Sequence, residues 1–527
     1  MKRIFKLLTI ALVLVLLLSA CADDNAPVNT GGGVVADSPP VSPSVVPSAP
    51  IVADGVVIPS PNMKLDGFDI GEKYERFYPD TTLGVIPRED YGELLPFIGG
   101  KNEFMWFPSP TYGFCTTDGK IVCDPTYANV EQLAFEGETV YILMRATGEA
   151  WDSEIGQSRM YLMAADGSFV SEYEEIHDGF EGTITVKKAG RWGSVDYFGK
   201  EVIPFMYEHP IFFGESVAAV TEDFSEGYKY IDKSNETVLG NLPAIPSRRV
   251  DQRSVWGYEE AYAELFRDIA FSRGRALYYE GDSYGYIDKT GKIIAMYRDD
   301  EGWFRGERFI AEYTVVLNGS QYAVIDTDAN VIIPFSDTHI RIIKSGEETV
   351  FAPESTETRF YDAAGNELPW ELDKSAYYYN DPSGLIFVQR KNGKFDALLK
   401  DGKEIPVPEC SYFCVVSNDR IILSGPEGLN YDLLIDGNGT IIADSRADGE
   451  NCRFRDYYPP DQDYVIYTRD YRLNGIMSFD GELITKPIFE VIEKFGEYYA
   501  VQGDRVGGLL DKDGKWVVKT ALLSSND

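Results

Sequence analysis

The sequence predicts an all-β protein built from tandem β-hairpin repeats in a propeller-like arrangement. A block of strand, polar turn and strand recurs with a mean spacing of roughly 40 residues, which lies in the range of propeller blades. Tyrosine and phenylalanine are abundant, at 34 and 29 of the 527 residues, and both favour strands. Because a period alone does not separate a closed arrangement from an open one, an open β-array or solenoid is the alternative.

The clearest copy of the block runs over 191–204 and has the order of a β-hairpin. Its first arm is largely apolar, a turn with Asp196 and Gly199 follows, and its second arm ends at Pro204. Glycine accepts the positive φ that tight turns require, and proline is tolerated at a strand end, where no ladder donor is needed. The turn position recurs eleven times along the chain. It is occupied by Gly119, Gly167, Gly199, Asn235, Gly291, Ala329, Gly365, Gly402, Gly439, Gly481 and Gly514.

Many copies are preceded by a further strand that begins with Phe and Gly. Phe213-Gly214 stands before the apolar run 217–220, and Phe495-Gly496 stands before 499–501. Each repeat is therefore predicted to contain three or four short strands. Eleven copies that share one order of elements disfavour a chance similarity of unrelated hairpins.

This block resembles the WG repeat, also called the KWG repeat, of bacterial proteins. The family pattern is an aromatic-Gly pair, then Tyr-Ile-Asp, two variable residues, Gly-Lys and a Val-Ile-Pro strand. The signature residues of the two best copies are Trp192, Gly193, Asp196, Gly199, Tyr284, Gly285, Asp288 and Gly291. The resemblance spans about 104–518, but Trp192-Gly193 is the only literal pair in register, and Trp256-Gly257 is out of register. It supplies no catalytic residues, and we interpret Trp192 and Gly193 as packing residues.

One segment has helical periodicity. Tyr258, Tyr262, Leu265 and Ile269 recur at intervals of three and four, which is typical of an amphipathic helix. Four repeats precede this helix and seven follow it, and seven is a familiar number of propeller blades. We therefore expect an N-terminal β-repeat region over 64–240, a linker with the helix over 241–270, and a C-terminal seven-unit region over 271–527.

The first twenty residues predict export. Lys2, Arg3 and Lys6 precede an uncharged apolar run over 7–18, and small residues then lead to Cys21. This order describes a signal peptide, and the apolar run is shorter than the roughly 20 residues of a membrane-spanning helix. Leu-Ser-Ala-Cys resembles the lipobox of bacterial lipoproteins, which implies cleavage after residue 20 and acylation of Cys21. An ordinary secretory signal with a chance cysteine is the alternative.

The segment 21–63 is rich in Pro, Ser and Val, with Pro39-Pro40, Pro43, Pro47 and Pro50 closely spaced. Proline fixes φ and removes donors, so we expect an extended, disordered stalk. A functional spacer through a surface layer and a spacer without length requirement are equally consistent with it. Together with the lipid signal, this segment places the working part on the extracytoplasmic face of the cell membrane.

The charge balance excludes several partners. The chain has 49 basic and 85 acidic residues, a formal net charge of −36. Nucleic acids and anionic lipid surfaces both need basic surface, so neither is an expected partner of the folded part. The acidic residues are scattered, which is typical of a solvated surface, and attraction of cations or basic ligands is the minor alternative.

The sequence lacks the usual signs of chemistry. Its three histidines have no partner at metal-ligand spacing. Asp326 begins a run like a calcium loop, but Val331 stands where that loop needs glycine, and the run coincides with the repeat's own turn. Of the cysteines after Cys21, only Cys115 and Cys123 lie where a hairpin disulfide is plausible, and buried free thiols are the default. We expect no metal and no cofactor.

These observations favour a non-enzymatic function. We expect a lipid-tethered binding or interaction scaffold for a protein or glycan, because repeat folds present extended surfaces and variable loops. One alternative is a cell-envelope enzyme that processes glycans or peptides through carboxylates, whose pairing in space the sequence does not reveal. The other is a structural component of an envelope assembly.

Overall fold

The computed structural model describes most of the chain from residue 91 to 521. The described ranges are 52–53, 56–57, 91–102, 109–145, 160–222, 226–246, 258–298, 306–345, 348–353, 359–373, 375–380, 384–417, 419–426, 428–446, 452–455, 463–469, 472–503 and 506–521. The predicted signal peptide, Cys21, most of the stalk and the Trp256-Gly257 pair lie outside these residues. All described elements belong to one compact unit, Pro50–Asp527.

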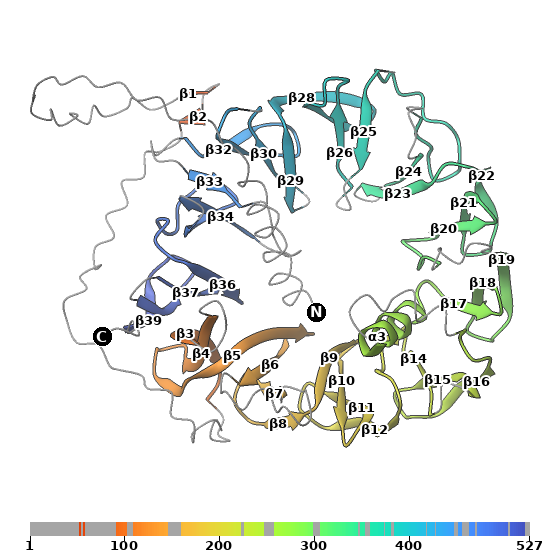
Figure 1. Cartoon of the computed structure of the whole chain (residues 1–527), viewed down its shortest axis with the longest axis horizontal. Helices are drawn as coiled ribbons and strands as arrows, with labels where there is room; N and C mark the ends of the chain where they lie inside the picture. Colours follow the sequence, from red (N-terminus) through yellow and green to blue (C-terminus); the bar gives the residue numbers. More distant parts are fainter. Residues whose placement is uncertain are drawn as a thin grey trace, which may run out of the picture. The chain divides into compact units, whose positions relative to one another are not determined.

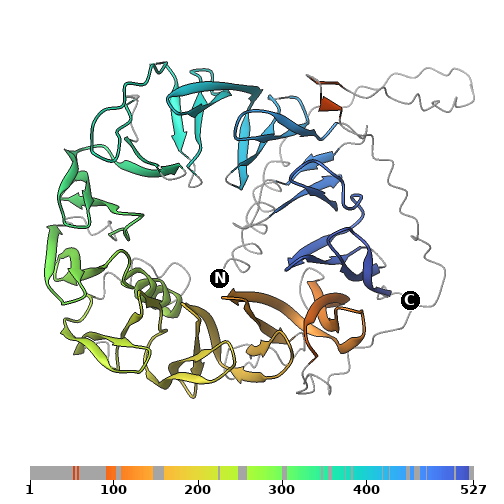
Figure 2. The same ribbon diagram turned by 180° about the vertical axis from the view of Figure 1, so that it is seen from behind.

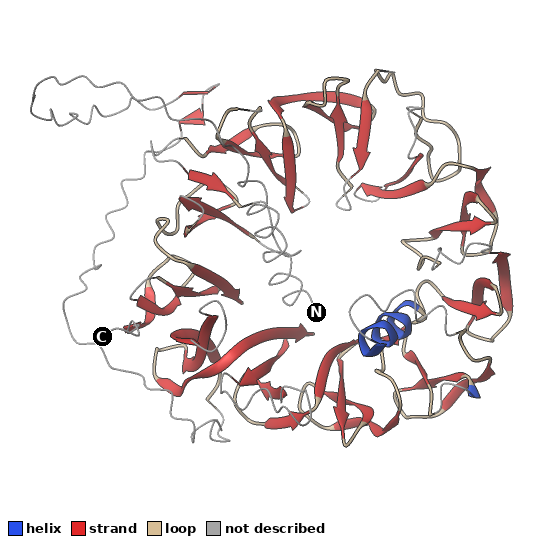
Figure 3. Cartoon of the chain, viewed as in Figure 1, coloured by secondary structure: helices blue, strands red, loops and turns tan. Residues whose placement is uncertain are grey.

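The described chain is almost entirely β-structure, as predicted (Figures 1 and 3). Its first half contains the strands β1 (Val52–Ala53), β2 (Val56–Val57), β3 (Leu94–Asn102), β4 (Ser109–Thr116), β5 (Ile121–Phe135), β6 (Glu138–Arg145), β7 (Met160–Ala164), β8 (Val170–Tyr173), β9 (Glu175–Phe180), β10 (Thr183–Lys188), β11 (Arg191–Asp196), β12 (Glu201–Tyr207), β13 (Phe213–Gly214), β14 (Val217–Val220), β15 (Tyr228–Asp232) and β16 (Thr237–Leu242).

The helix α3 (Tyr258–Asp268) separates these strands from the second half. The later strands are β17 (Arg275–Glu280), β18 (Ser283–Asp288), β19 (Ile293–Arg298), β20 (Tyr313–Asn318), β21 (Gln321–Asp326), β22 (Val331–Ser336), β23 (Ile340–Ser345), β24 (Glu348–Pro353), β25 (Tyr377–Asn380), β26 (Ile386–Gln389), β27 (Phe395–Lys400), β28 (Lys403–Cys410), β29 (Tyr412–Ser417), β30 (Arg420–Ser424), β31 (Asp432–Asp436), β32 (Ile441–Asp444), β33 (Cys452–Phe454), β34 (Tyr464–Arg469), β35 (Leu473–Ser478), β36 (Val491–Phe495), β37 (Tyr498–Gln502), β38 (Val506–Leu510) and β39 (Trp516–Ala521).

The strands form separate small antiparallel sheets in which neighbours in space are neighbours in sequence. The sheets are β1–β2, β3–β8, β9–β12, β13–β16, β17–β19, β20–β22, β23–β24, β25–β28, β29–β32, β33–β35 and β36–β39. The six-stranded sheet β3–β8 contains two predicted repeats, because the long strand β5 pairs with both β4 and β6. The turn at Gly119 joins β4 to β5, and the turn at Gly167 joins β7 to β8. The β1–β2 pair is a difference from the predicted stalk. Valines there flank an Asp-Gly sequence, a common signal for a two-residue hairpin.

The predicted hairpin turns are confirmed at all eleven positions. Every residue at the turn position has a positive φ, between 62° at Asn235 and 85° at Gly119. In most copies an aspartate before the turn fixes it, and Asp196 is typical. Its Oδ1 accepts hydrogen bonds from the backbone amides of Phe198 and Lys200, both at 2.9 Å. The side chain therefore stabilises the turn in the manner of an Asx turn.

The same turn also joins one sheet to the next. A Cβ at Gly199 would lie 3.0 Å from the ring of Phe169 in the preceding repeat, and a Cβ at Gly514 would lie 2.6 Å from the carbonyl oxygen of Ile484. Glycine is therefore needed at these turns for close approach as well as for positive φ.

The last sheet packs against the first (Figures 1 and 2). The Tyr112 hydroxyl donates a hydrogen bond of 2.5 Å to Glu493 Oε2, and the Gly496 amide donates one of 3.1 Å to Gln132 Oε1. Phe495 and Leu509 belong to the same buried cluster as Phe114. This contact between the ends of the repeat series favours the propeller-like arrangement over the open array.

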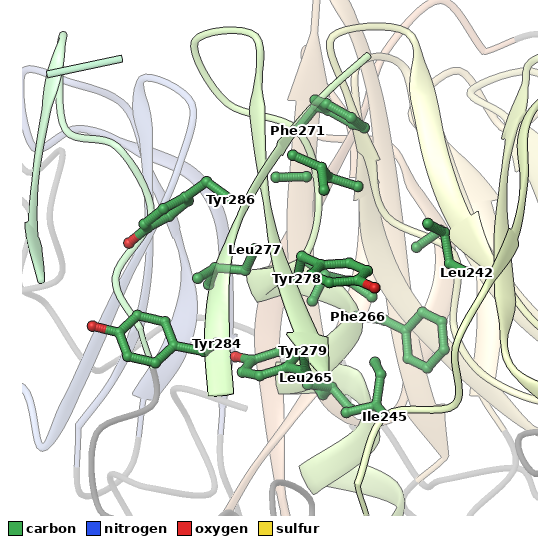
Figure 4. Packing of buried hydrophobic residues seen from close by; sticks show 14 of the residues in the cluster. Leu242, Ile245, Leu265, Phe266, Phe271, Leu277, Tyr278, Tyr279, Tyr284 and Tyr286 are labelled. Atoms are coloured by element: carbon green, nitrogen blue, oxygen red, sulfur yellow. The ribbon is translucent and has the colours of Figure 1, made fainter. Parts of the chain in front are cut away.

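The predicted helix is confirmed as α3, and its buried residues join a shared core (Figure 4). Leu265, Phe266 and Ile269 are buried together with Leu242 and Tyr279, which come from strands on both sides of the helix. The helix is held by this apolar contact, which is the usual source of helix stability in proteins. The division of the chain at this helix into two repeat regions stays a prediction.

Candidate functional site

A depression lies around the two-stranded sheet β23–β24. It has a volume of about 1010 Å³. Its lining comes from five stretches of chain: Arg273 before β17, residues 311–313 at the start of β20, the start of β24, the segment 362–370, and Asp401 between β27 and β28. Residues far apart in sequence therefore meet there, and we call this depression the acidic pocket.

Four carboxylates line the acidic pocket: Glu312, Glu348, Asp362 and Asp401. Arg273 is the one arginine in the lining, and its guanidinium lies 3.9 Å from Glu312 with both side chains more than half exposed. Such a pair contributes little to stability. The lining therefore carries a negative charge that a ligand can neutralise.

Asp362 is held ionised by its own turn. The side-chain amide of Asn366, followed by the backbone amides of the turn, donates hydrogen bonds to its carboxylate and lowers the pKa of Asp362 below its ordinary value. The Asn366 and Ala364 amides lie 2.8 and 2.9 Å from Oδ1. Because a general acid for neutral pH needs a raised pKa, this carboxylate is suited to attract a ligand and poorly suited to donate a proton.

Two aromatic side chains form the walls of the acidic pocket. The Trp370 ring lies 5.0 Å from Phe360 and covers Gly402 so closely that no Cβ fits there. The Tyr313 hydroxyl donates a hydrogen bond of 3.1 Å to the Ala363 carbonyl, and its ring meets Phe351 edge-on. Both rings are therefore fixed before any ligand arrives, which lowers the entropic cost of binding.

This combination suits binding of a cationic or hydroxyl-rich group. A lysine or arginine side chain would find carboxylates beside an aromatic face, the usual setting for cation–π contact. A sugar would find acceptors for its hydroxyl groups beside a flat apolar ring.

The sequence-predicted signature residues lie in sheets and turns and are absent from the lining of the acidic pocket. Trp192 is 3% exposed and stacks on His177 at 5.5 Å. A Cβ at Gly193 would lie 2.7 Å from the Ile203 carbonyl oxygen, so the glycine allows two strands to approach. Asp196 and Gly199 form the turn described above.

The second copy of the signature is arranged in the same way. The buried Tyr284 hydroxyl donates a hydrogen bond of 2.9 Å to the Leu317 carbonyl in the next sheet, and Gly285 lies against the Ala295 carbonyl. Asp288 Oδ1 accepts from the Thr290 and Lys292 amides, and Gly291 has a φ of 81°.

The run that resembles a calcium loop is a repeat turn. Asp326 Oδ1 accepts the backbone amides of Asp328 and Asn330, and its Oδ2 accepts the Asn330 side-chain amide. Both of its oxygens therefore accept hydrogen bonds from within the turn. Among the described residues, no group of three or more His, Cys, Asp or Glu side chains has a metal-binding arrangement.

The five cysteines of the described chain are free thiols. Cys115 and Cys123 are both buried in the same hairpin, but Cys123 lies opposite Phe114, so the register places the two cysteines out of line. Burial raises the pKa of Cys115 and Cys410 to about 12, which makes both thiols unreactive. Within the described ranges, no helix is long and apolar enough to cross a membrane.

Sequence reasoning missed the acidic pocket. Tyr313, Glu348 and Trp370 belong to no recognised motif, and Asp362 and Asp401 look like any other turn aspartates. The usable signal was the segment 360–368, a weak copy of the repeat that is followed by Pro369-Trp370 in place of a Val-Ile-Pro strand.

No protein-family model matches the chain, and no curated protein matches its sequence. Solved structures with a similar arrangement include BamB from Moraxella catarrhalis, at 11% identity and a TM-score of 0.26, with 64% of this chain and 94% of that chain covered. The Neurospora crassa Pan2 WD40 domain has 13% identity and a TM-score of 0.22, with 45% and 82% covered. The Pyrococcus horikoshii acylaminoacyl peptidase has 12% identity and a TM-score of 0.28, with 76% and 53% covered. These values concern the fold alone, which is all-β and propeller-like.

Proposed function

We propose that this chain is a WG-repeat lipoprotein, anchored through Cys21 on the extracytoplasmic face of the cell membrane. Its β-repeat part binds a protein or glycan partner there without catalysing a reaction. The acidic pocket carries this proposal, because it joins rigid aromatic walls to exposed carboxylates, and such open, aromatic-lined surfaces are typical of recognition sites.

The carboxylates of the acidic pocket support binding more than catalysis. Asp362 has a lowered pKa caused by its turn hydrogen bonds, and Glu312 is paired loosely with Arg273. Catalytic carboxylate pairs need one member with a raised pKa. The same groups in their ionised state attract cations and accept hydroxyl hydrogen bonds.

The anchor is tested by metabolic labelling with palmitate. Wild-type protein should carry the label and sediment with membranes, whereas Cys21→Ala should lose the label and be recovered in the soluble fraction. Recovery of unlabelled wild-type protein outside the membrane would contradict the anchor.

Partner binding is tested by chemical crosslinking on intact cells followed by mass spectrometry. Wild-type protein should yield a reproducible partner, and a Glu348→Gln/Asp401→Asn variant should lose it. A Glu482→Gln/Asp513→Asn variant is the matched control, because it removes the same charge from two exposed turns outside the pocket. Turnover of a wall glycan or peptide that is lost in the pocket variant would favour the enzyme alternative.

A further inference from the structure

Two half-buried arginines near the end of α3 differ from four other half-buried arginines of this protein. In those four the Nε donates a hydrogen bond to a carboxylate or a carbonyl. They are Arg275, Arg390, Arg420 and Arg453. In contrast, the Nε atoms of Arg267 and Arg308 are buried and have no hydrogen-bond partner within the described structure.

Both positions are fixed by their surroundings. Arg267 lies in the last turn of α3, and its guanidinium carbon is 4.8 Å from the ring centroid of Phe212 and 5.8 Å from that of Phe180. Arg308 lies beside Phe309, which is buried against Tyr286 at 5.0 Å. The Glu307 carbonyl accepts a hydrogen bond of 2.8 Å from the Tyr286 hydroxyl. The Arg267 guanidinium is therefore held by packing on two rings, and the backbone that carries Arg308 is fixed by its neighbours Glu307 and Phe309.

The two arginines are close enough for their charges to interact. Burial lowers the pKa of Arg267, and the positive charge of Arg308 lowers it further, while Asp268, Glu264 and Asp178 act in the opposite direction. Burial also lowers the pKa of Arg308. In a chain with 36 more acidic than basic residues, two neighbouring arginines with unsatisfied donors are unusual, because a buried donor without an acceptor is costly.

The carboxylates around the pair leave these donors unused. Asp178 Oδ1 accepts the Phe180 backbone amide at 2.9 Å, and burial raises the pKa of Asp178 above its ordinary value. Asp268 and Glu264 lie beside Arg267 on the same helix and act on it through their charge, and the charge of Asp268 acts on Arg308 as well. Among the described residues, therefore, no oxygen accepts a hydrogen bond from the Nε of Arg267 or Arg308.

We propose that Arg267 and Arg308 together bind an oxyanion, a phosphate or carboxylate group carried by a ligand. Guanidinium groups recognise both groups through paired N–H donors. The rings of Phe180 and Phe212 pack against the Arg267 guanidinium in cation–π contacts, which hold it in a fixed orientation. This site shares no residue with the acidic pocket. Because its binding groups are cationic, it accepts an anion, whereas the acidic pocket accepts a cation or a hydroxyl-rich group.

The test uses the whole folded chain and inorganic phosphate as the probe. Thermal unfolding is followed in sodium phosphate and in sodium chloride of equal ionic strength. For wild-type protein, phosphate should raise the melting temperature by on the order of 2 °C relative to chloride, because binding to the folded state stabilises it. Arg308→Gln should lose this rise, and Arg308→Lys should keep only part of it, because lysine retains the charge but not the fork of donors.

Three comparisons make the outcome decisive. Arg472→Gln, at an exposed position, should keep the full response to phosphate. Arg267→Gln should likewise lose the response to phosphate. If loss of the contact between Arg267 and Phe212 impairs folding of that variant, Arg308→Gln alone decides the test. Sodium acetate in place of phosphate separates a carboxylate site from a phosphate site. An equal rise in wild-type and Arg308→Gln proteins, or no rise with either anion, would overturn the proposal.

Discussion

The sheets β9–β12 and β23–β24 belong to two copies of the same repeat. The first, the regular sheet, has all four strands, whereas the second, the reduced sheet, has only two. The regular sheet has four hydrogen-bonded strands, and Trp192 on β11 is buried in a cluster with Phe213 and Ala218 of the next sheet. The reduced sheet has two strands, and the segments that would form the others make only the isolated bridges Phe351–Tyr361 and Tyr361–Glu367. The acidic pocket lies at the reduced sheet.

The difference shows which part of the repeat is needed for the fold and which part is available for function. Both repeats keep the turn: Asp362 accepts the turn amides as Asp196 does, and Gly365 approaches the Ile332 carbonyl of the sheet before it. The reduced repeat has Leu368-Pro369-Trp370 where the regular repeat has a Val-Ile-Pro strand. We infer that loss of this strand makes room for the acidic pocket, while the turn keeps the sheet docked.

The largest expected effect concerns the two tryptophans. Trp192→Ala should lower the free energy of unfolding by about 3–5 kcal/mol, because it removes a fully buried indole. Trp370→Ala, at a half-buried position, should lower it by about 1–2 kcal/mol and should abolish partner crosslinking. Urea unfolding of both variants measures the difference, and equal losses of stability would show that the two sheets are not distinct.

Acid sensitivity is expected beside the regular sheet, at His209 between β12 and β13. Burial, assisted by the charge of Lys187, lowers the pKa of His209 from 6.5 to about 4. The unfolded chain therefore binds a proton at this residue between about pH 6.5 and 4 that the folded chain does not. The contribution of neutral His209 to the free energy of unfolding is fully present above pH 6.5. It is lost as the pH drops through this window, by an amount on the order of 3 kcal/mol.

The variant His209→Phe separates this effect from general acid denaturation. Phenylalanine retains a ring to stack on Tyr262, which lies 3.9 Å from the His209 ring. Its free energy of unfolding should change less with pH between 6.5 and 4 than that of the wild type. An unchanged pH dependence in this variant would assign the acid sensitivity to other groups.

A smaller effect is expected at the turns. Asp196→Ala removes the acceptor of two backbone amides and should lower the free energy of unfolding by about 1 kcal/mol. Asp196→Asn keeps an acceptor oxygen and should cost less. If both variants unfold at the same urea concentration as the wild type, the aspartate does not stabilise the turn.

The smallest effect on stability is expected in the acidic pocket. Glu348→Gln with Asp401→Asn should change the free energy of unfolding by no more than about 0.5 kcal/mol per site, because both side chains are exposed. The same variant should lose its partner. Loss of binding together with a large loss of stability would mean that these carboxylates hold the reduced sheet together.

The sequence was sufficient to predict the fold because each repeat carries a local signal. The turn residues, the apolar arms and the spacing of Tyr262 and Leu265 in α3 depend on neighbours a few residues away, where pattern reasoning works. Gly402 and Gly365 mark the turns that contain Asp401 and Asp362.

The acidic pocket was not predictable by the same reasoning. It joins Arg273 to Asp401 across more than a hundred residues, and their proximity depends on how four successive sheets pack. The unsatisfied Nε atoms of Arg267 and Arg308 are likewise a property of burial, which no local pattern reports. Such departures from local rules are where functional sites are expected.

Site-specific photo-crosslinking tests the central claim that the reduced repeat forms the binding site. A photoreactive phenylalanine derivative replaces Glu348 at the acidic pocket or Glu482 at an exposed turn outside it, and the cells that carry the chain are irradiated intact. We predict one discrete covalent adduct from position 348 that is absent from position 482 and is lost on adding Asp401→Asn. The same adduct from both positions, or none from position 348 in cells where chemical crosslinking captures a partner, would contradict the account.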